Sequence, residues 1–220
     1  MRSDVAGGSM RLIAVGAMAV LAAAGAARAD PPPISAGCDD AVSRGVWDLA
    51  IDLCAPEMLP AGTPDATKAH ILLGRALAYE KTGDKARAAA DIADAAKLDP
   101  DSADLHAARA RSLQVKGQHA AALKELDIAF GKTADPPAAF HILRAGILRD
   151  LGKDDQALPE LDRAIAQDRR NAQAYAMRAT IYLSRQDNGR AQADIQSATS
   201  LAQNCELKAK QQTYVFTCPE

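Results

Sequence analysis

An Arg-Ala dipeptide recurs four times along the chain at almost the same interval. Its arginines are Arg75, Arg109, Arg144 and Arg178, so the steps are 34, 35 and 34 residues. A period of this length is typical of proteins built from stacked helix pairs, in which each pair contacts only its neighbours. The periodicity therefore predicts an all-α solenoid, and it favours a surface that holds a partner over a catalytic site.

Other residue types follow the same period. Residues at the same position of successive units are called a column. The first column contains bulky residues, at Tyr79, Leu113, Leu148 and Tyr182. Alanine columns follow at 88, 122, 157 and 191 and at 95, 129, 164 and 198, with aliphatic residues at 92, 126, 161 and 195. Glycine separates the two halves of the first three units, at Gly83, Gly117 and Gly152, whereas the fourth unit has Gln186 there.

These columns explain how two helices would pack. Small residues let the helix backbones approach closely, the bulky residues fill the gaps, and alanine is the strongest helix former. We expect four helix pairs, at residues 67–82 with 85–98, 103–116 with 119–130, 138–151 with 154–167, and 172–185 with 188–202.

The pattern resembles the tetratricopeptide repeat (TPR) family, whose unit combines a first helix carrying small and aromatic residues with a second helix of A-x₃-F type. The resemblance implies a right-handed superhelical solenoid over residues 67–204, with repeats at about 69–102, 103–137, 138–171 and 172–204. The chain departs from the family at its tryptophan position, which holds Leu72, His106, His141 and Tyr175.

The first 29 residues have the pattern of a signal peptide. Arg2 and Arg11 precede an apolar run, and Ala27-Arg28-Ala29 supplies a site with small residues, so we expect cleavage after Ala29. Met10 is an alternative start. Residues 30–37 form a Pro-rich leader. These features predict a periplasmic or secreted protein without a transmembrane span in its mature form.

Lipid anchoring at Cys38 is the alternative that we weighed and disfavour. Ser35-Ala36-Gly37-Cys38 resembles the end of a bacterial lipobox, but serine stands where a branched apolar residue is expected.

The four cysteines lie outside the repeats, two on each side. Disulfides form in oxidising compartments, and the two ends of a long stack would lie too far apart for a cross-link. We therefore predict the pairs Cys38–Cys54 and Cys205–Cys218. A metal site is disfavoured because the chain has no C-x₂-C pair.

Both ends are expected to cap the solenoid. Residues 38–66 align with a degenerate helical hairpin followed by a loop at 55–66, in which Cys38 faces Cys54. Residues 205–220 would form a C-terminal cap, with a short helix at 206–212 and Tyr214-Val215-Phe216 folding back.

An acidic column shares the period of the arginines, at Asp91, Glu125, Glu160 and Asp194. We favour a ladder of ion pairs between helices, within or between units, over a row of anion-binding arginines. For His106 and His141, packing is favoured over a pH-sensitive or metal-binding pair.

The concave face of this family is its usual binding surface, and the resemblance places the candidate groove on the first helices. The positions chosen there are Leu73, Leu77, Glu80, Arg111, Gln114, Ile142, Arg149, Thr180 and Leu183. Leu73 and Leu77 stand where chaperone-binding relatives carry a clamp for a peptide carboxylate.

Composition and motifs exclude several functions. Removal of residues 1–29 lowers the formal net charge from −2 to about −4, whereas nucleic-acid binders show basic patches. No catalytic motif is present, and we predict no catalytic residue, cofactor or metal. The expected function is a non-enzymatic scaffold or adaptor for a protein or peptide of the bacterial cell envelope. The alternatives are a structural subunit of an envelope assembly and an accessory domain to an enzyme encoded elsewhere.

Overall fold

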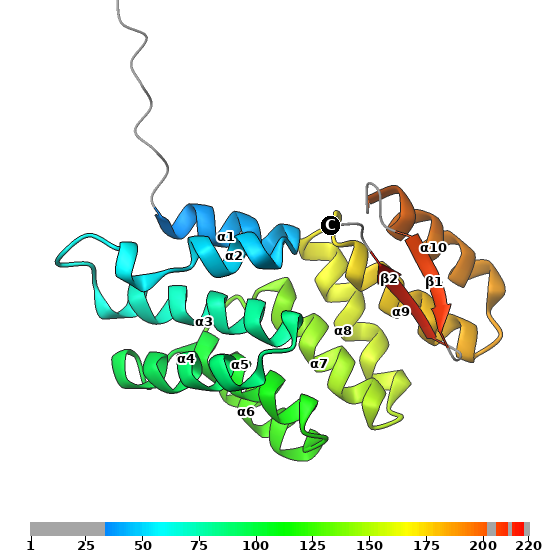
Figure 1. Cartoon of the computed structure of the whole chain (residues 1–220). Helices are drawn as coiled ribbons and strands as arrows, with labels where there is room; N and C mark the ends of the chain where they lie inside the picture. Colours follow the sequence, from blue (N-terminus) through cyan, green and yellow to red (C-terminus); the bar gives the residue numbers. More distant parts are fainter. Residues whose placement is uncertain (1–33, 202–205, 211–212, 218–220) are drawn as a thin grey trace, which may run out of the picture. The chain divides into compact units, whose positions relative to one another are not determined.

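The computed structural model describes residues 34–201, 206–210 and 213–217. Residues 34–201 form a solenoid of antiparallel helix pairs (Figure 1). The four full pairs are α3 (Asp65–Thr82) with α4 (Lys85–Leu98), α5 (Ala103–Val115) with α6 (His119–Gly131), α7 (Ala138–Asp150) with α8 (Asp154–Gln167), and α9 (Ala172–Ser184) with α10 (Asn188–Leu201). Each predicted helix boundary lies within two residues of the observed one. The proposed signal peptide, its cleavage site, Cys205 and Cys218 lie outside the described residues.

The turns between paired helices need a left-handed backbone. Gly83, Gly117 and Gly152 adopt φ angles of 92°, 74° and 70° there, which glycine tolerates because it has no Cβ. Gln186 adopts φ 61° at the equivalent place in the fourth unit. The fourth turn therefore keeps the geometry of the others with a residue that is strained by it.

The alanine columns form the centre of the solenoid. Every residue of the two alanine columns is buried, from Ala88 and Ala95 in the first unit to Ala191 and Ala198 in the fourth. The largest fully buried side chains are the aliphatic residues Ile71, Leu105, Leu126, Ile147, Leu161 and Ile181. Burial of such a side chain contributes about 1.5–3 kcal/mol, and their hydrophobic clusters include residues of a neighbouring unit.

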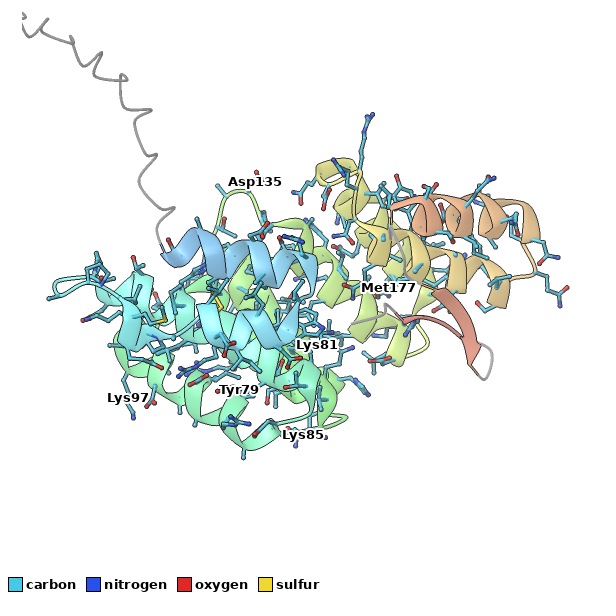
Figure 2. The ribbon with its side chains drawn as sticks, turned by 45° about the horizontal axis from the view of Figure 1, so that its top comes forward. Tyr79, Lys81, Lys85, Lys97, Asp135 and Met177 are labelled. Carbon is cyan, nitrogen blue, oxygen red and sulfur yellow. A yellow bond between two sulfur atoms is a disulfide. The ribbon has the colours of Figure 1, made fainter. Side chains whose placement is uncertain are left out.

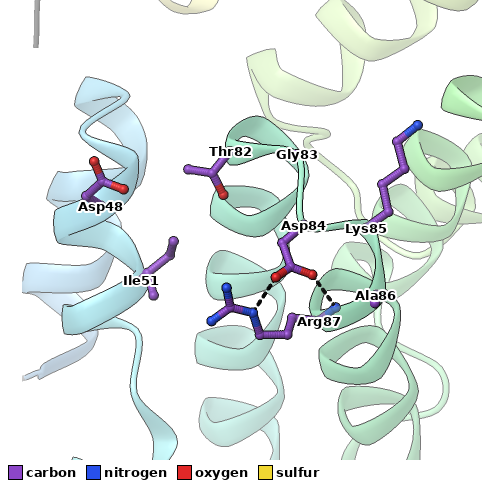
Figure 3. Close-up of a pocket in the computed structure, with 8 residues that line it drawn as sticks. All are labelled: Asp48, Ile51, Thr82, Gly83, Asp84, Lys85, Ala86 and Arg87. Carbon is purple, nitrogen blue, oxygen red and sulfur yellow. Dashed lines mark hydrogen bonds and ion pairs between the residues drawn. The ribbon is translucent and has the colours of Figure 1, made fainter.

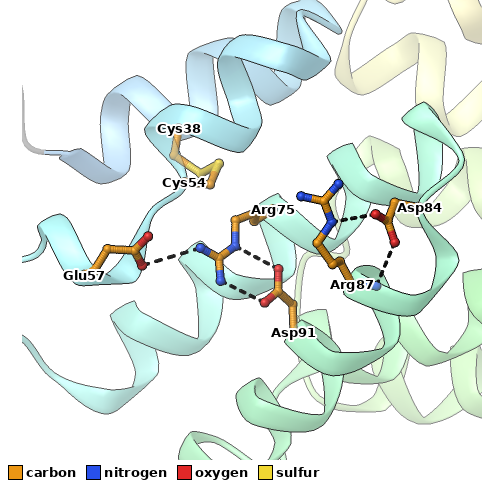
Figure 4. Close-up of polar contacts among 7 residues, drawn as sticks. All are labelled: Cys38, Cys54, Glu57, Arg75, Asp84, Arg87 and Asp91. Carbon is orange, nitrogen blue, oxygen red and sulfur yellow. Dashed lines mark hydrogen bonds and ion pairs between the residues drawn. A yellow bond between two sulfur atoms is a disulfide. The ribbon is translucent and has the colours of Figure 1, made fainter.

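A helical hairpin precedes the first full unit, as the sequence predicts. Helices α1 (Ile34–Arg44) and α2 (Trp47–Leu53) are joined by a disulfide between Cys38 and Cys54, whose Cα atoms are 4.8 Å apart (Figure 4). A Cβ at Gly74 of α3 would lie 2.9 Å from the Cys38 Sγ atom and 3.2 Å from that of Cys54. Glycine is therefore required in the middle of α3 because the disulfide packs directly on the helix backbone.

The segment after α2 is more ordered than predicted. The expected loop at 55–66 contains a short 3₁₀ helix, η1 (Pro56–Met58), and α3 begins at Asp65.

The C-terminal segment differs from its predicted conformation. Residues expected to form a short capping helix are instead the strand β1 (Glu206–Lys210), which pairs antiparallel with β2 (Thr213–Thr217). Strand β2 contacts α9. The sequence Thr-Tyr-Val-Phe-Thr is rich in β-branched and aromatic residues, which favour strands, and an antiparallel partner supplies the backbone hydrogen bonds of its neighbour.

Candidate partner-binding groove

The arginines of the repeated Arg-Ala pairs make different contacts in different units. The first and fourth units are called the outer units here, and the second and third the inner units. In the first unit Arg75 donates two hydrogen bonds to Asp91, both at 2.9 Å (Figure 4). In the fourth unit Arg178 donates two to Asp194, both at 2.8 Å. The carboxylates raise the pKa of both guanidinium groups. These are the interhelix ion pairs that the sequence predicts.

The inner units replace this pair by histidine and glutamate. His106 Nδ1 lies 2.8 Å from Glu125 Oε2, and His141 Nδ1 lies 2.6 Å from Glu160 Oε2. Arg144 contacts Asp127 instead and stacks 3.7 Å from the centre of the Phe130 ring. Both histidines are buried in the packing position of the repeat, so they are structural, and the expected uniform ladder of arginines is wrong for the inner units.

The outer units also share a charged turn. Asp84 caps α4 by accepting a hydrogen bond from the Arg87 amide at 3.0 Å, and the Arg87 guanidinium lies 4.5 Å from the Tyr79 ring. Its counterpart in the fourth unit consists of Asp187, Arg190 and Tyr182. These hydrogen bonds lower the pKa of both aspartates.

The turn of the first unit borders a wide hollow next to α2 (Figure 3). Its volume is about 620 Å³, and its lining includes Asp48 and Ile51 as well as the turn residues. Asp84 and Arg87 lie three residues apart on one wall of this hollow and pair with each other, so the groups of this pair are already engaged within the chain.

The candidate groove is built from the first helices of the units, since α3 contacts α5 and α5 contacts α7. Three predicted groove residues are not available at its surface. Leu73 and Ile142 are each 7 % exposed and belong to the hydrophobic core. The Thr180 hydroxyl is buried and donates to the Ala176 carbonyl. The predicted apolar entrance therefore depends on Leu77 alone.

The remaining predicted residues keep part of their surface open. They are Leu77, Glu80, Arg111, Gln114, Arg149 and Leu183. The structure brings three of them together, because Glu80, Arg111 and Gln114 line one cavity of about 360 Å³.

The rest of the cavity lining was not predicted. It consists of Lys81, Val115 and Asp150. These three residues are 34 and 35 residues apart, so they form a column of the repeat directly after the one that contains Glu80 and Gln114. The signal that could have found them was therefore present, one position along the first helix.

Burial dominates the electrostatics of the cavity. It raises the pKa of Glu80 and lowers the pKa of Lys81 and Arg111, because an isolated charge is unfavourable away from water. The closest approach between Glu80 and Arg111 is 3.6 Å, too long for a hydrogen bond. Glu80 Oε2 is buried and accepts no hydrogen bond from the described part of the chain.

One wall of the cavity is held by a hydrogen bond between units. The Gln114 side-chain amide donates to Asp150 Oδ2 at 2.6 Å. A Cβ at Gly146 would lie 3.2 Å from the Gln114 Nε2 atom, so the missing side chain leaves room for this amide. His119 Nδ1 lies 3.9 Å from the same Asp150 oxygen.

A second polar link joins the N-terminal hairpin to the groove face. His70 Nε2 lies 2.8 Å from Asp39 of α1, and its Nδ1 lies 3.2 Å from Asp104 of α5. The hydrogen bonds to Asp104 and Asp39 raise the pKa of His70 to about 9. A protonated imidazole therefore bridges three helices at neutral pH.

The described residues contain no group of His, Cys, Asp and Glu side chains placed to hold a metal ion. None of their helices is both long enough and apolar enough to cross a membrane.

Comparison with known families supports the repeat assignment. The tetratricopeptide repeat family matches residues 69–102 and 172–205, which contain the first and fourth helix pairs. These two segments are tetratricopeptide repeats. The family pattern therefore fits the units with an Arg–Asp pair, and the inner units carry the His–Glu variation.

Solved structures share the TPR fold of this chain. A tetratricopeptide repeat protein from Parabacteroides merdae ATCC 43184 has a TM-score of 0.58 at 17% identity, over 76% of this chain and 64% of that one. The Cut9–Hcn1 hetero-tetramer of APC/C gives 0.57 at 17% identity, over 76% of this chain and 32% of that one. MamA gives 0.49 at 18% identity, over 76% of this chain and 94% of that one. No curated protein matches the sequence.

Proposed function

We propose that this TPR protein is a non-catalytic scaffold or adaptor that binds a protein or peptide of the bacterial cell envelope through its first helices. The observation that carries the proposal is the cavity of about 360 Å³, whose lining comes from α3, α5 and α7. Grooves that several helices build together suit an extended peptide or a helix of a partner.

Export to an oxidising compartment is supported by two observations. The first 29 residues have the composition of a signal peptide. The hairpin disulfide closes α1 onto α2 and is of the kind that persists outside the cytosol. The predicted Cys205–Cys218 pair has further support, because these residues directly flank Glu206 and Thr217, which pair in the hairpin.

Export is tested on protein expressed with its native N-terminus. We expect the mature chain to begin at Asp30 and to contain no reactive thiol before reduction. Retention of residues 1–29, or four thiols that react without reduction, would exclude the exported form.

The binding face is tested by photo-crosslinking in cells. A crosslinking amino acid at Leu77 or Arg149, which lie on first helices, should give an adduct of defined mass. Lys97 lies in the last turn of α4, a second helix, with its side chain projecting outward (Figure 2), and serves as the matched control. Adducts that form only from Lys97 would move the binding surface to the outer face.

A structural subunit of a larger envelope assembly is the second candidate. Val46 and Leu49 at α2 are 40 % and 42 % exposed, although both are apolar. Such residues are often covered in assemblies. Stable copurification in a large complex that is lost in a Val46→Ser/Leu49→Ser variant would favour this function.

A further inference from the structure

We propose that the cavity lined by Glu80, Arg111 and Asp150 is a subsite for an uncharged amide group of the partner. The inference rests on the proposed function and names the chemistry that the groove selects. Two sources present this chemistry, the peptide backbone of an extended partner and the side chain of an asparagine or glutamine.

The charges of the cavity select against ionic groups. A cationic ligand would meet Arg111 and Lys81, and an anionic ligand would meet Glu80 and Asp150. Lys116 adds a further positive charge near Glu80. An ionic ligand entering this space would thus gain from one pair of charges and lose against the other, whereas a neutral dipolar group avoids this conflict.

The polar atoms of the cavity match a ligand group that both donates and accepts hydrogen bonds. Glu80 Oε2 is a buried acceptor without a donor in the described residues. The Arg111 guanidinium has five N–H donors and no hydrogen bond to the neighbouring carboxylate, which lies 3.6 Å away. An amide N–H would donate to the Glu80 carboxylate, whose side chain is 11 % exposed, while its carbonyl oxygen accepts from Arg111. Burial of unsatisfied groups of this kind is unfavourable, so binding would recover the lost hydrogen bonds.

The position and rigidity of the cavity suit such a subsite. Lys81, Val115 and Asp150 lie in the last turns of α3, α5 and α7, so three units meet around one opening. The Gln114–Asp150 hydrogen bond fixes the third side of this opening. A rigid site of this type loses little conformational entropy on binding.

The experiment uses small capped amino acids as probes. The full exported chain is titrated by NMR with N-acetylglutamine N-methylamide, and with the corresponding glutamate and lysine compounds. We expect the glutamine compound to shift the Gln114 side-chain resonance and to bind about tenfold more tightly than either charged compound. N-acetylalanine N-methylamide separates the two sources, because equal binding of this compound assigns the subsite to the backbone.

The decisive variant is Glu80→Leu/Arg111→Leu, which removes acceptor and donor together. Replacement of both members of a buried, poorly paired ion pair by apolar residues is often neutral for stability. We therefore expect an unchanged melting temperature and at least a tenfold loss of amide binding. The control is Asp94→Leu/Lys97→Leu, which removes an exposed ion pair of α4 without a change in net charge.

Several results would overturn the inference. Tight binding of the charged probes, unchanged amide binding in the Glu80→Leu/Arg111→Leu variant, or a loss of stability of more than about 10 °C would each contradict it. If the probes fail while crosslinks still form from Leu77 and Arg149, the inference falls and the proposed function stands. Probe binding without groove crosslinks would instead contradict the proposed function.

Discussion

The outer and inner units of the solenoid have the same backbone but different polar cores. The first and fourth units join their helices through Arg–Asp pairs, Arg75–Asp91 and Arg178–Asp194. The second and third use His106–Glu125 and His141–Glu160. The longer basic side chain, arginine, pairs with the shorter acid, aspartate. The shorter basic side chain, histidine, pairs with the longer acid, glutamate. A repeat can thus keep its geometry while the residues that fix it change together.

The largest difference in stability between the two kinds of pair should appear when the acidic residue is removed. An Asp91→Ala substitution leaves the charged and mostly buried Arg75 guanidinium with only the exposed Glu57 carboxylate, 3.5 Å away, and we expect a loss of about 3 kcal/mol in the free energy of unfolding. Glu125→Ala in the second unit should cost only about 1–2 kcal/mol, because the Glu125 side chain is 28 % exposed and one hydrogen bond is lost in place of two. Urea unfolding of both variants measures the difference. Equal losses would mean that the two kinds of pair are energetically the same.

An exchange of the two patterns should show coupling. In the variant His106→Leu/Glu125→Asp, the second unit receives the residues of the first. Arg109 makes no ion pair with the described residues of the chain. In this variant it would gain a carboxylate in the position that Asp91 has relative to Arg75. We expect the double variant to be more stable than the sum of the single changes by about 1 kcal/mol. Additive losses in a double-mutant cycle would argue against an interchangeable core.

The fourth turn offers a stabilising test. Gln186 has a φ angle of 61°, whereas Gly152 occupies the same place in the third unit. Gln186→Gly should raise the free energy of unfolding by about 0.5–1 kcal/mol, because relief of strain exceeds the added freedom of the unfolded chain. The reverse change, Gly152→Ala, should lower it by a similar amount. Thermal unfolding of both variants checks the sign, and a destabilised Gln186→Gly protein would show that the turn is not strained.

The smallest effect concerns a histidine outside both kinds of core. Because the pKa of His70 is raised to about 9, above its unfolded value of about 6.5, its contribution is complete below pH 6.5. It is lost as the pH rises through 9. His70 and its aspartates are about half exposed, so screening should reduce this contribution to below about 1 kcal/mol. The stability difference between wild type and His70→Gln, measured from pH 6 to pH 10, should shrink with pH. A constant difference would exclude the bridge.

The sequence predicts the helices well because their packing repeats. Columns of alanine locate each helix in four independent copies. The alignment of Cys38 with a small-residue column and of Cys54 with the aliphatic column predicts their disulfide. The exposed residues of the groove are harder to predict from the sequence. Periodicity identifies the face of the solenoid on which a residue lies, but not how far neighbouring units bury it. Leu73 and Ile142 lie on the chosen face but are buried there. The C-terminal strands have no repeated copy, so only local composition was available for them.

The glycine under the disulfide makes the array directional. Gly74 leaves space for the sulfur atoms of Cys38 and Cys54, whereas the equivalent residues in the later units are Ala108, Leu143 and Met177. A larger residue at that place would push the hairpin away. The hairpin can therefore dock on only one of the four units. New units could be inserted between the existing ones during evolution, but the first unit must remain first.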